Sequence, residues 1–169
     1  MATSTLVQYL EASGVSVSGA VQYFGTNPSD RLQNETFLTE TAITKGQLVA
    51  VDVSKMGTDA SGGLTALTVV AGDFNSVPVQ KVVVGVAAES VTGTATSPQP
   101  IKVVVRGIAS SVPVIAATAV GSPLCLDEAG AAGSAEVYTA AKVGHVLGYA
   151  LTSTAGPGTV TAYILGCGI

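Results

Sequence analysis

The chain has 169 residues, enough for one domain with its own apolar core. Charged residues make up only 11% of it, against about 25% in typical proteins, and the few cationic residues are scattered. The longest apolar runs are the length of a strand and fall well short of the ~18 residues that a membrane-spanning helix needs. This composition predicts neither a membrane nor a nucleic-acid partner.

Residues 1–40 differ in composition from the rest, and we predict that they form an extended N-terminal arm. Short apolar segments at 6–10 (LVQYL) and 21–24 (VQYF) are separated by Ser- and Gly-rich sequence. Neither segment is long enough for a stable helix. The alternative is that this stretch adds a pair of strands to the main core. Because the first Lys or Arg is Arg31, we expect no secretory signal peptide.

Residues 41–169 have the pattern of a β-body. Apolar residues alternate with other residues in short runs such as 101–106 (IKVVVR), which is typical of strands with one buried face. Clusters rich in Gly, Pro, Asn and Asp separate the runs, and no helical periodicity is present. The sequence therefore predicts an all-β fold, with an antiparallel β-barrel or sandwich as the body.

A motif occurs twice in this body. Each copy has a glycine followed six residues later by an aspartate, then a second glycine signature, and it closes on an apolar strand that ends in glycine. The landmarks are Gly46, Asp52, Gly85 and Gly107 in the first copy, and Gly121, Asp127, Gly148 and Gly166 in the second. We predict two similar halves, repeat one at about 41–115 and repeat two at about 116–169. Convergent strand and turn chemistry is the alternative.

No group of residues has the composition of a reaction centre. His145 is the only histidine, and its flanking sequence predicts a partly buried residue on a packed strand. Cys125 and Cys167 are expected to be buried free thiols, with a bridge between them as the alternative. Asp127 is expected to start a turn, because Ala and Gly follow where a calcium loop would need oxygen ligands. We therefore predict no catalytic, cofactor-binding or metal-binding residue, and no enzyme.

A soluble chain with so few charges has difficulty covering its own surface with solvated groups. We therefore expect much of the surface to be buried against other subunits. A homo-oligomer follows, and we expect a trimer, since three heterologous contacts in a closed ring would hide apolar surface without forming an endless fibre.

Four stretches resemble small capsid decoration (cement) proteins of tailed bacteriophages. They are residues 8–12 (QYLEA), 33–37 (QNETF), 42–50 (AITKGQLVA) and the later pattern of 84–107 (VGVA followed by VVVRG). The resemblance implies a β-rich structural virion protein, made in the host cytoplasm, that sits on the outside of the head. It also implies that the major capsid protein is the partner, and that bridging its subunits stabilises the capsid. The alternative is a β-rich surface- or glycan-binding module of a fibre.

The resemblance supplies no contact residues, so the candidates come from composition. Half of the aromatic residues lie before residue 38, and aromatic side chains are favoured anchors at interfaces. The predicted capsid-binding residues are Leu6, Tyr9, Leu10, Tyr23, Phe24 and Phe37.

Overall fold

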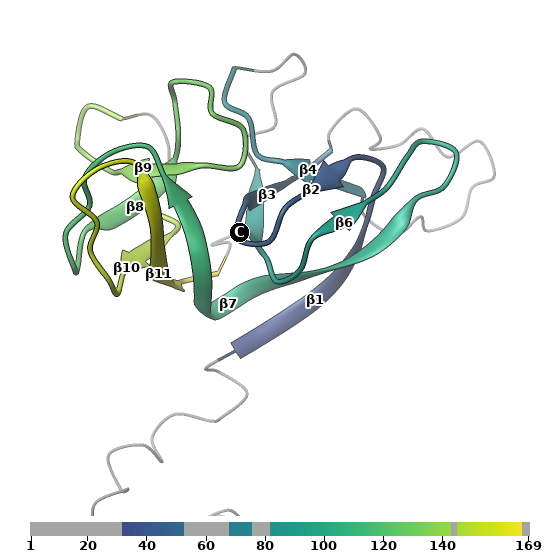
Figure 1. The fold of residues 1–169 in the computed structure, drawn as a ribbon, viewed down its shortest axis with the longest axis horizontal. Coiled ribbons are helices and arrows are strands. Elements are labelled where there is room, and N and C mark those ends of the chain that lie inside the picture. The colour runs from purple at the N-terminus through teal and green to yellow at the C-terminus, as the bar shows by residue number, and fades with distance from the viewer. Residues whose placement is uncertain (1–31, 53–67, 76–81, 143–144, 167–169) are drawn as a thin grey trace, which may run out of the picture. The chain divides into compact units, whose positions relative to one another are not determined.

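The computed structural model describes residues 32–52, 68–75, 82–142 and 145–166, and within these ranges all the regular elements are β-strands (Figure 1). The predicted all-β class is confirmed. No helix in the described ranges is long and apolar enough to cross a membrane. The strands are β1 (Leu32–Thr39), β2 (Ala42–Ile43), β3 (Leu48–Val51), β4 (Thr68–Ala71), β5 (Val83–Ala87), β6 (Val91–Thr92), β7 (Gln99–Val114), β8 (Pro123–Leu126), β9 (Ala135–Val137), β10 (Gly148–Ala150) and β11 (Gly158–Ile164).

Nine of these strands form two closed rings that share β7. The first ring follows the order β1-β4-β3-β5-β7 and closes because β1 also pairs with β7. The second follows β7-β11-β10-β8-β9 and closes because β9 pairs with β7 at Val114. Neighbours are antiparallel except for β1–β4 and β7–β9, which are parallel. Strands β2 and β6 form a separate small sheet.

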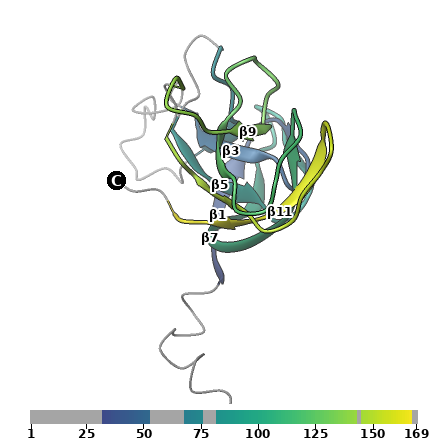
Figure 2. The same ribbon diagram turned by 90° about the vertical axis from the view of Figure 1, so that its left-hand side faces the viewer.

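Strand β7 is long enough to serve both rings because it has 16 residues. Its first half alternates buried Ile101 and Val103 with exposed Lys102 and Arg106, as a strand with one inward face requires. The rings meet at Gly107, which pairs with β1 on one edge and with β11 on the other. Figure 1 shows β7 running from one ring into the other, and Figure 2 shows it beside β11.

The two rings follow the same strand plan, and most of their paired positions match. Gly46 donates its N–H to the carbonyl of Ala87, and Gly121 donates to the carbonyl of Ala150, both at 2.8 Å. The strand registers agree in the same way. Val49 lies opposite Gly85 in the first ring, and Leu124 lies opposite Gly148 at the same place in the second. The other matching pairs are Val86–Val104 with Tyr149–Tyr163, and Thr39–Gln99 with Val114–Gly158. The prediction of two similar halves is confirmed by these registers.

The boundaries differ from those predicted. Residues 32–39, assigned to the arm, form β1 and pair with β7 along their whole length. Most of β1 is exposed, so main-chain hydrogen bonds rather than apolar packing place it, and its composition does not look like that of the body. The repeats also divide within β7, near Gly107, and not at about 115, because the second half of β7 is the counterpart of β1.

The buried residues form two clusters. The interior of the first ring holds Ile43, Val49, Val69, Ala87, Ile101 and Val103. The larger cluster contains the interior of the second ring, from Val112 and Leu124 to Ile164, and also Leu48, Val86 and Val104. These last three alternate with the interior residues of β3, β5 and β7, so they lie on the outer face of the first ring. The second ring therefore covers one outer face of the first.

Candidate interaction surface

Among the described residues, the junction of the rings leaves too little space for a small-molecule ligand. The gap there has a volume of about 10 Å³ and is lined mainly by apolar residues, among them Leu48, Leu147 and Ile164. That volume is at most sufficient for one water molecule. Within the described ranges, no group of three or more His, Cys, Asp or Glu residues is arranged to hold a metal ion.

Of the predicted capsid-binding residues, only Phe37 lies within the described ranges. It is half-buried on β1, opposite Ile101, and packs against the core of the first ring. Its side chain therefore contributes to the packing of the first ring. Leu6, Tyr9, Leu10, Tyr23 and Phe24 lie outside the described residues.

His145 does not occupy the predicted environment. It is exposed and precedes β10, which begins only at Gly148. The strand that pairs with β8 and β11 covers only Gly148–Ala150, so His145 has no strand partner among the described residues.

Cys125 is a buried free thiol, as predicted, while Cys167 lies outside the described residues. Its Sγ donates a weak hydrogen bond to the carbonyl of Glu136 at 3.7 Å. Burial, and next the nearby carboxylates of Glu136 and Glu128, raise the pKa of Cys125 to about 11. Because the thiolate is the reactive form, this thiol is inert at neutral pH.

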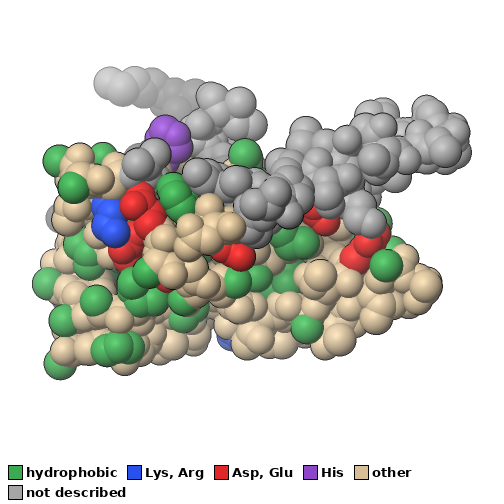
Figure 3. All heavy atoms as spheres, turned by 90° about the horizontal axis from the view of Figure 1, so that it is seen from above, with side chains coloured by type: hydrophobic (Ala, Val, Ile, Leu, Met, Phe, Trp, Pro, Cys, Tyr) green, Lys and Arg blue, Asp and Glu red, His purple; other side chains and the backbone are tan. Residues whose placement is uncertain are grey.

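Acidic side chains gather where β8 and β9 are joined. Glu136 accepts the N–H of Glu128 at 2.9 Å through Oε1 and forms an ion pair with the Lys142 ammonium at 2.7 Å through Oε2. The hydrogen bond with Glu136 raises the pKa of Lys142 above its ordinary value. Figure 3, the view from above, shows a Lys or Arg side chain next to acidic side chains. These contacts hold the connection between β8 and β9 in place, and they use both carboxylate oxygens of Glu136.

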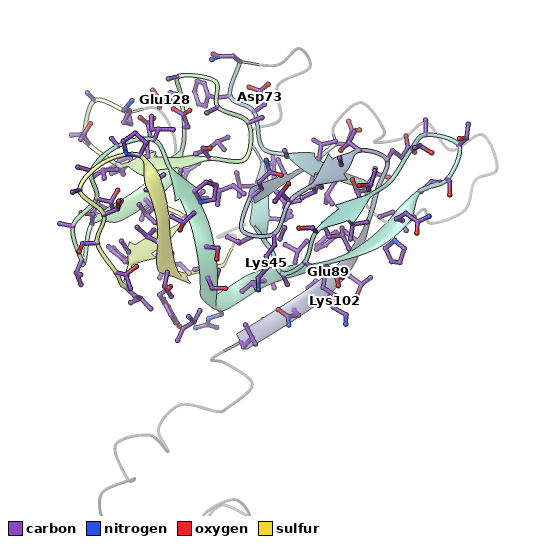
Figure 4. All side chains as sticks on the ribbon, in the orientation of Figure 1. Lys45, Asp73, Glu89, Lys102 and Glu128 are labelled. Carbon is purple, nitrogen blue, oxygen red and sulfur yellow. The ribbon has the colours of Figure 1, made fainter. Side chains whose placement is uncertain are left out.

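Other polar and charged side chains also hold loops in place. The Asn75 side-chain amide donates to the carbonyl of Glu128 at 3.2 Å, and Figure 4 shows Asp73 and Glu128 on adjacent loops. On the first ring, Glu89 accepts the N–H of Lys102 at 3.0 Å. The described charges therefore contribute to local structure more clearly than to a binding site.

Asp127 starts the turn after β8, as predicted, and the turn depends on its carboxylate. The buried side chain accepts the N–H of Ala129 through Oδ1 and that of Ala131 through Oδ2, both at 2.8 Å. In Asp127→Asn one acceptor becomes a donor that faces an N–H, so we expect a loss of about 1–3 kcal/mol in the free energy of unfolding, measured by urea denaturation. Glu35→Gln removes the same charge from exposed β1 and should change it by less than about 0.5 kcal/mol. Equal effects would contradict this role of Asp127.

An exposed apolar row crosses the outer face of the second ring. Tyr149 of β10 lies opposite Tyr163 of β11, which lies opposite Ile108 of β7, so the three side chains share one face. Tyr149 is 42% exposed and Ile108 55% exposed, while Tyr163 is half-buried. We call these three residues the outer row. Leu151 and Leu165, two positions beyond the tyrosines, are also exposed.

The sequence analysis did not identify the outer row, although it contained a signal. In β10, Tyr149 lies between the small residues Gly148 and Ala150, which are buried while Tyr149 points outward. A rule that places the largest apolar residue inside assigns β10 to the wrong face.

Neither a protein-family model nor a curated protein sequence matches the chain. Among solved structures, it is similar to the N base of the head fiber protein gp8.5 of bacteriophage phi29. The TM-score is 0.50 at 16% sequence identity, and the match covers 79% of this chain and 93% of that chain. At this identity the similarity shows a shared fold.

Proposed function

We propose that the protein is a non-enzymatic structural component of a phage head, bound to the outer surface of the capsid. The observation that carries this proposal is the fold shared with a phage head fiber base over nearly the whole length of that base. Two further features support it. The chain has few charges for a soluble protein, and exposed apolar side chains gather on one face of the second ring.

In more detail, the protein binds the major capsid protein and bridges its subunits, so that the head becomes more resistant to disruption. Residues 1–31 carry attachment, through Leu6, Tyr9, Leu10, Tyr23 and Phe24. Aromatic anchors bury a large area at low entropic cost, and an extended segment can add a strand to the sheet edge of a neighbour. The β-body then lies on the outer side of the capsid surface and is exposed to solvent.

A second candidate function is supported by the same comparison. The phi29 protein is the base of a fiber, so the body described here would hold a fibre or a surface-binding module on the head. In that case the protein would bind the head without bridging its subunits. The two functions differ in one measurable respect, which is whether binding stabilises the head.

Adding purified protein to heads from a phage that lacks its gene separates these functions. Under either function we expect co-sedimentation of protein with heads at a fixed stoichiometry. A bridging protein should also raise the temperature at which the heads release DNA, measured by the fluorescence of an intercalating dye. Binding with no such shift would favour the fibre base, and absence of binding would overturn the proposed head association.

A further inference from the structure

Equivalent faces of the two rings differ in how they are covered. Leu48, Val86 and Val104 form a row on the outer face of the first ring and are buried by the second ring. The same positions in the second ring hold Pro123, Tyr149 and Tyr163, by the matched registers. Val86 is 1% exposed, whereas its counterpart Tyr149 is 42% exposed. The second ring therefore exposes the face that the first ring buries.

The backbone beside these rows shows the same difference. Gly46 and Gly121 are counterparts, with φ of 92° and 82°. A Cβ added at Gly46 would meet the carbonyl oxygen of Ser111 in the second half of β7, at 2.0 Å. A Cβ added at Gly121 would meet no atom within 4 Å. The same turn is thus in contact with the other ring in one repeat and open in the other.

The first ring carries the complement of this open face. Within one chain, the end of the second ring that covers the first ring includes Leu147, Ile164 and Gly166. These residues line the junction together with Val86. Their counterparts in the first ring are Val84, Val105 and Gly107. Val84 lines the same junction as Leu147 and Ile164. Val105 is only partly buried, Val82 is 57% exposed, and Leu32, which pairs with Gly107, is also exposed. We call Leu32, Val82 and Val105 the free end.

Most of the exposed large apolar residues in the described ranges belong to these two surfaces. Ile108, Tyr149, Leu151 and Leu165 lie on or beside the outer row, and Leu32 and Val82 lie on the free end, while Val120 lies next to the open turn at Gly121. Apolar exposure is thus concentrated at the two positions where the ring-to-ring contact would continue. Concentrated apolar surface of this kind marks interaction sites.

We propose that the outer row is a subunit interface that receives the free end of a second copy of this chain, in the way that the second ring covers the first within one chain. This contact continues an interface that the fold already contains. It is heterologous, since it joins two different surfaces, so copies associate head to tail and a closed ring of copies leaves neither surface free. The expected homotrimer is one such ring. The proposal does not depend on where the protein attaches.

Substitutions that place charge on each surface test the interface in the purified full chain, without heads. We expect the wild-type protein to sediment as an oligomer at micromolar concentration. Ile108→Glu with Tyr149→Glu should give a monomer with an unchanged circular dichroism spectrum, through a weakening of at least about a hundredfold, because the replaced anchors lie within the contact. Ala95→Glu, a charge at an exposed position of the connection between β6 and β7, outside both surfaces, should leave the oligomer intact.

Mixing variants tests the head-to-tail arrangement. Val82→Glu impairs only the free end, and the Ile108→Glu/Tyr149→Glu variant impairs only the outer row, so an equimolar mixture retains one intact pair of surfaces. We expect each variant alone to be a monomer and the mixture to contain a one-to-one heterodimer. A monomeric wild type, an oligomer that survives the outer-row substitutions, or a mixture that stays monomeric would each overturn the proposal. The proposed function would remain, since head binding is measured separately.

Discussion

Removal of residues 1–30 is expected to leave a folded body and to weaken binding to phage heads by at least about a hundredfold. The removed stretch contains Tyr9, Tyr23 and Phe24 among the eight aromatic residues of the chain, and the loss of two or three aromatic anchors is sufficient for such an effect. The described strands all belong to one compact unit that begins at Leu32. The truncated protein should therefore keep its β-type circular dichroism spectrum and its cooperative unfolding.

The structure determines where this truncation must end. The sequence suggested an arm up to residue 40, but a cut at residue 36 would remove more than half of β1, which pairs with β7 from Leu32 to Thr39. A deletion of residues 1–36 is thus a matched control that should destabilise the body. A second control keeps the full length and replaces Tyr9, Tyr23 and Phe24 with Ser. Full affinity of the 1–30 deletion in co-sedimentation would place attachment on the body.

The repeat could be predicted from the sequence because its landmarks are set by local backbone geometry. Gly46 and Gly121 have positive φ, which few other residues tolerate, and Asp127 holds the backbone of the following turn through its carboxylate. Such requirements leave the same residue at the same spacing in both halves. The buried thiol of Cys125 was predictable for a similar reason, since its neighbours in β8 are apolar.

The shared strand could not be predicted in the same way. Nothing local marks Gly107 as the junction of two rings, because the role of β7 arises from partners far away in the sequence, β1 before it and β11 after it. The sequence analysis assigned β1 to the arm because β1 is mostly exposed and its partner, β7, lies far away in the sequence. The outer row was missed because in β10 the small residues Gly148 and Ala150 are buried and the larger Tyr149 between them is exposed, which reverses the usual relation between size and burial.

Two matching glycines, Gly85 in β5 and Gly148 in β10, give the strongest test that the two rings are built in the same way. A Cβ at Gly85 would lie 2.2 Å from the carbonyl oxygen of Val104, and one at Gly148 would lie 2.1 Å from that of Tyr163. Both obstacles are backbone atoms of the adjacent strand, β7 in one ring and β11 in the other. Relief of the clash must therefore separate paired strands, which no side-chain rotation can avoid.

We expect Gly85→Ala and Gly148→Ala each to lower the free energy of unfolding by about 3 kcal/mol or more, which is large for the addition of one methyl group. Gly156→Ala is the control, since a Cβ there would meet nothing within 4 Å, and it should be neutral or slightly stabilising. Urea denaturation with unchanged slope measures all three. Because the two clashes are counterparts, their costs should be similar. Tolerance of alanine at one of the two positions would show that β5 and β10 are not held in the same way, in spite of their matching registers.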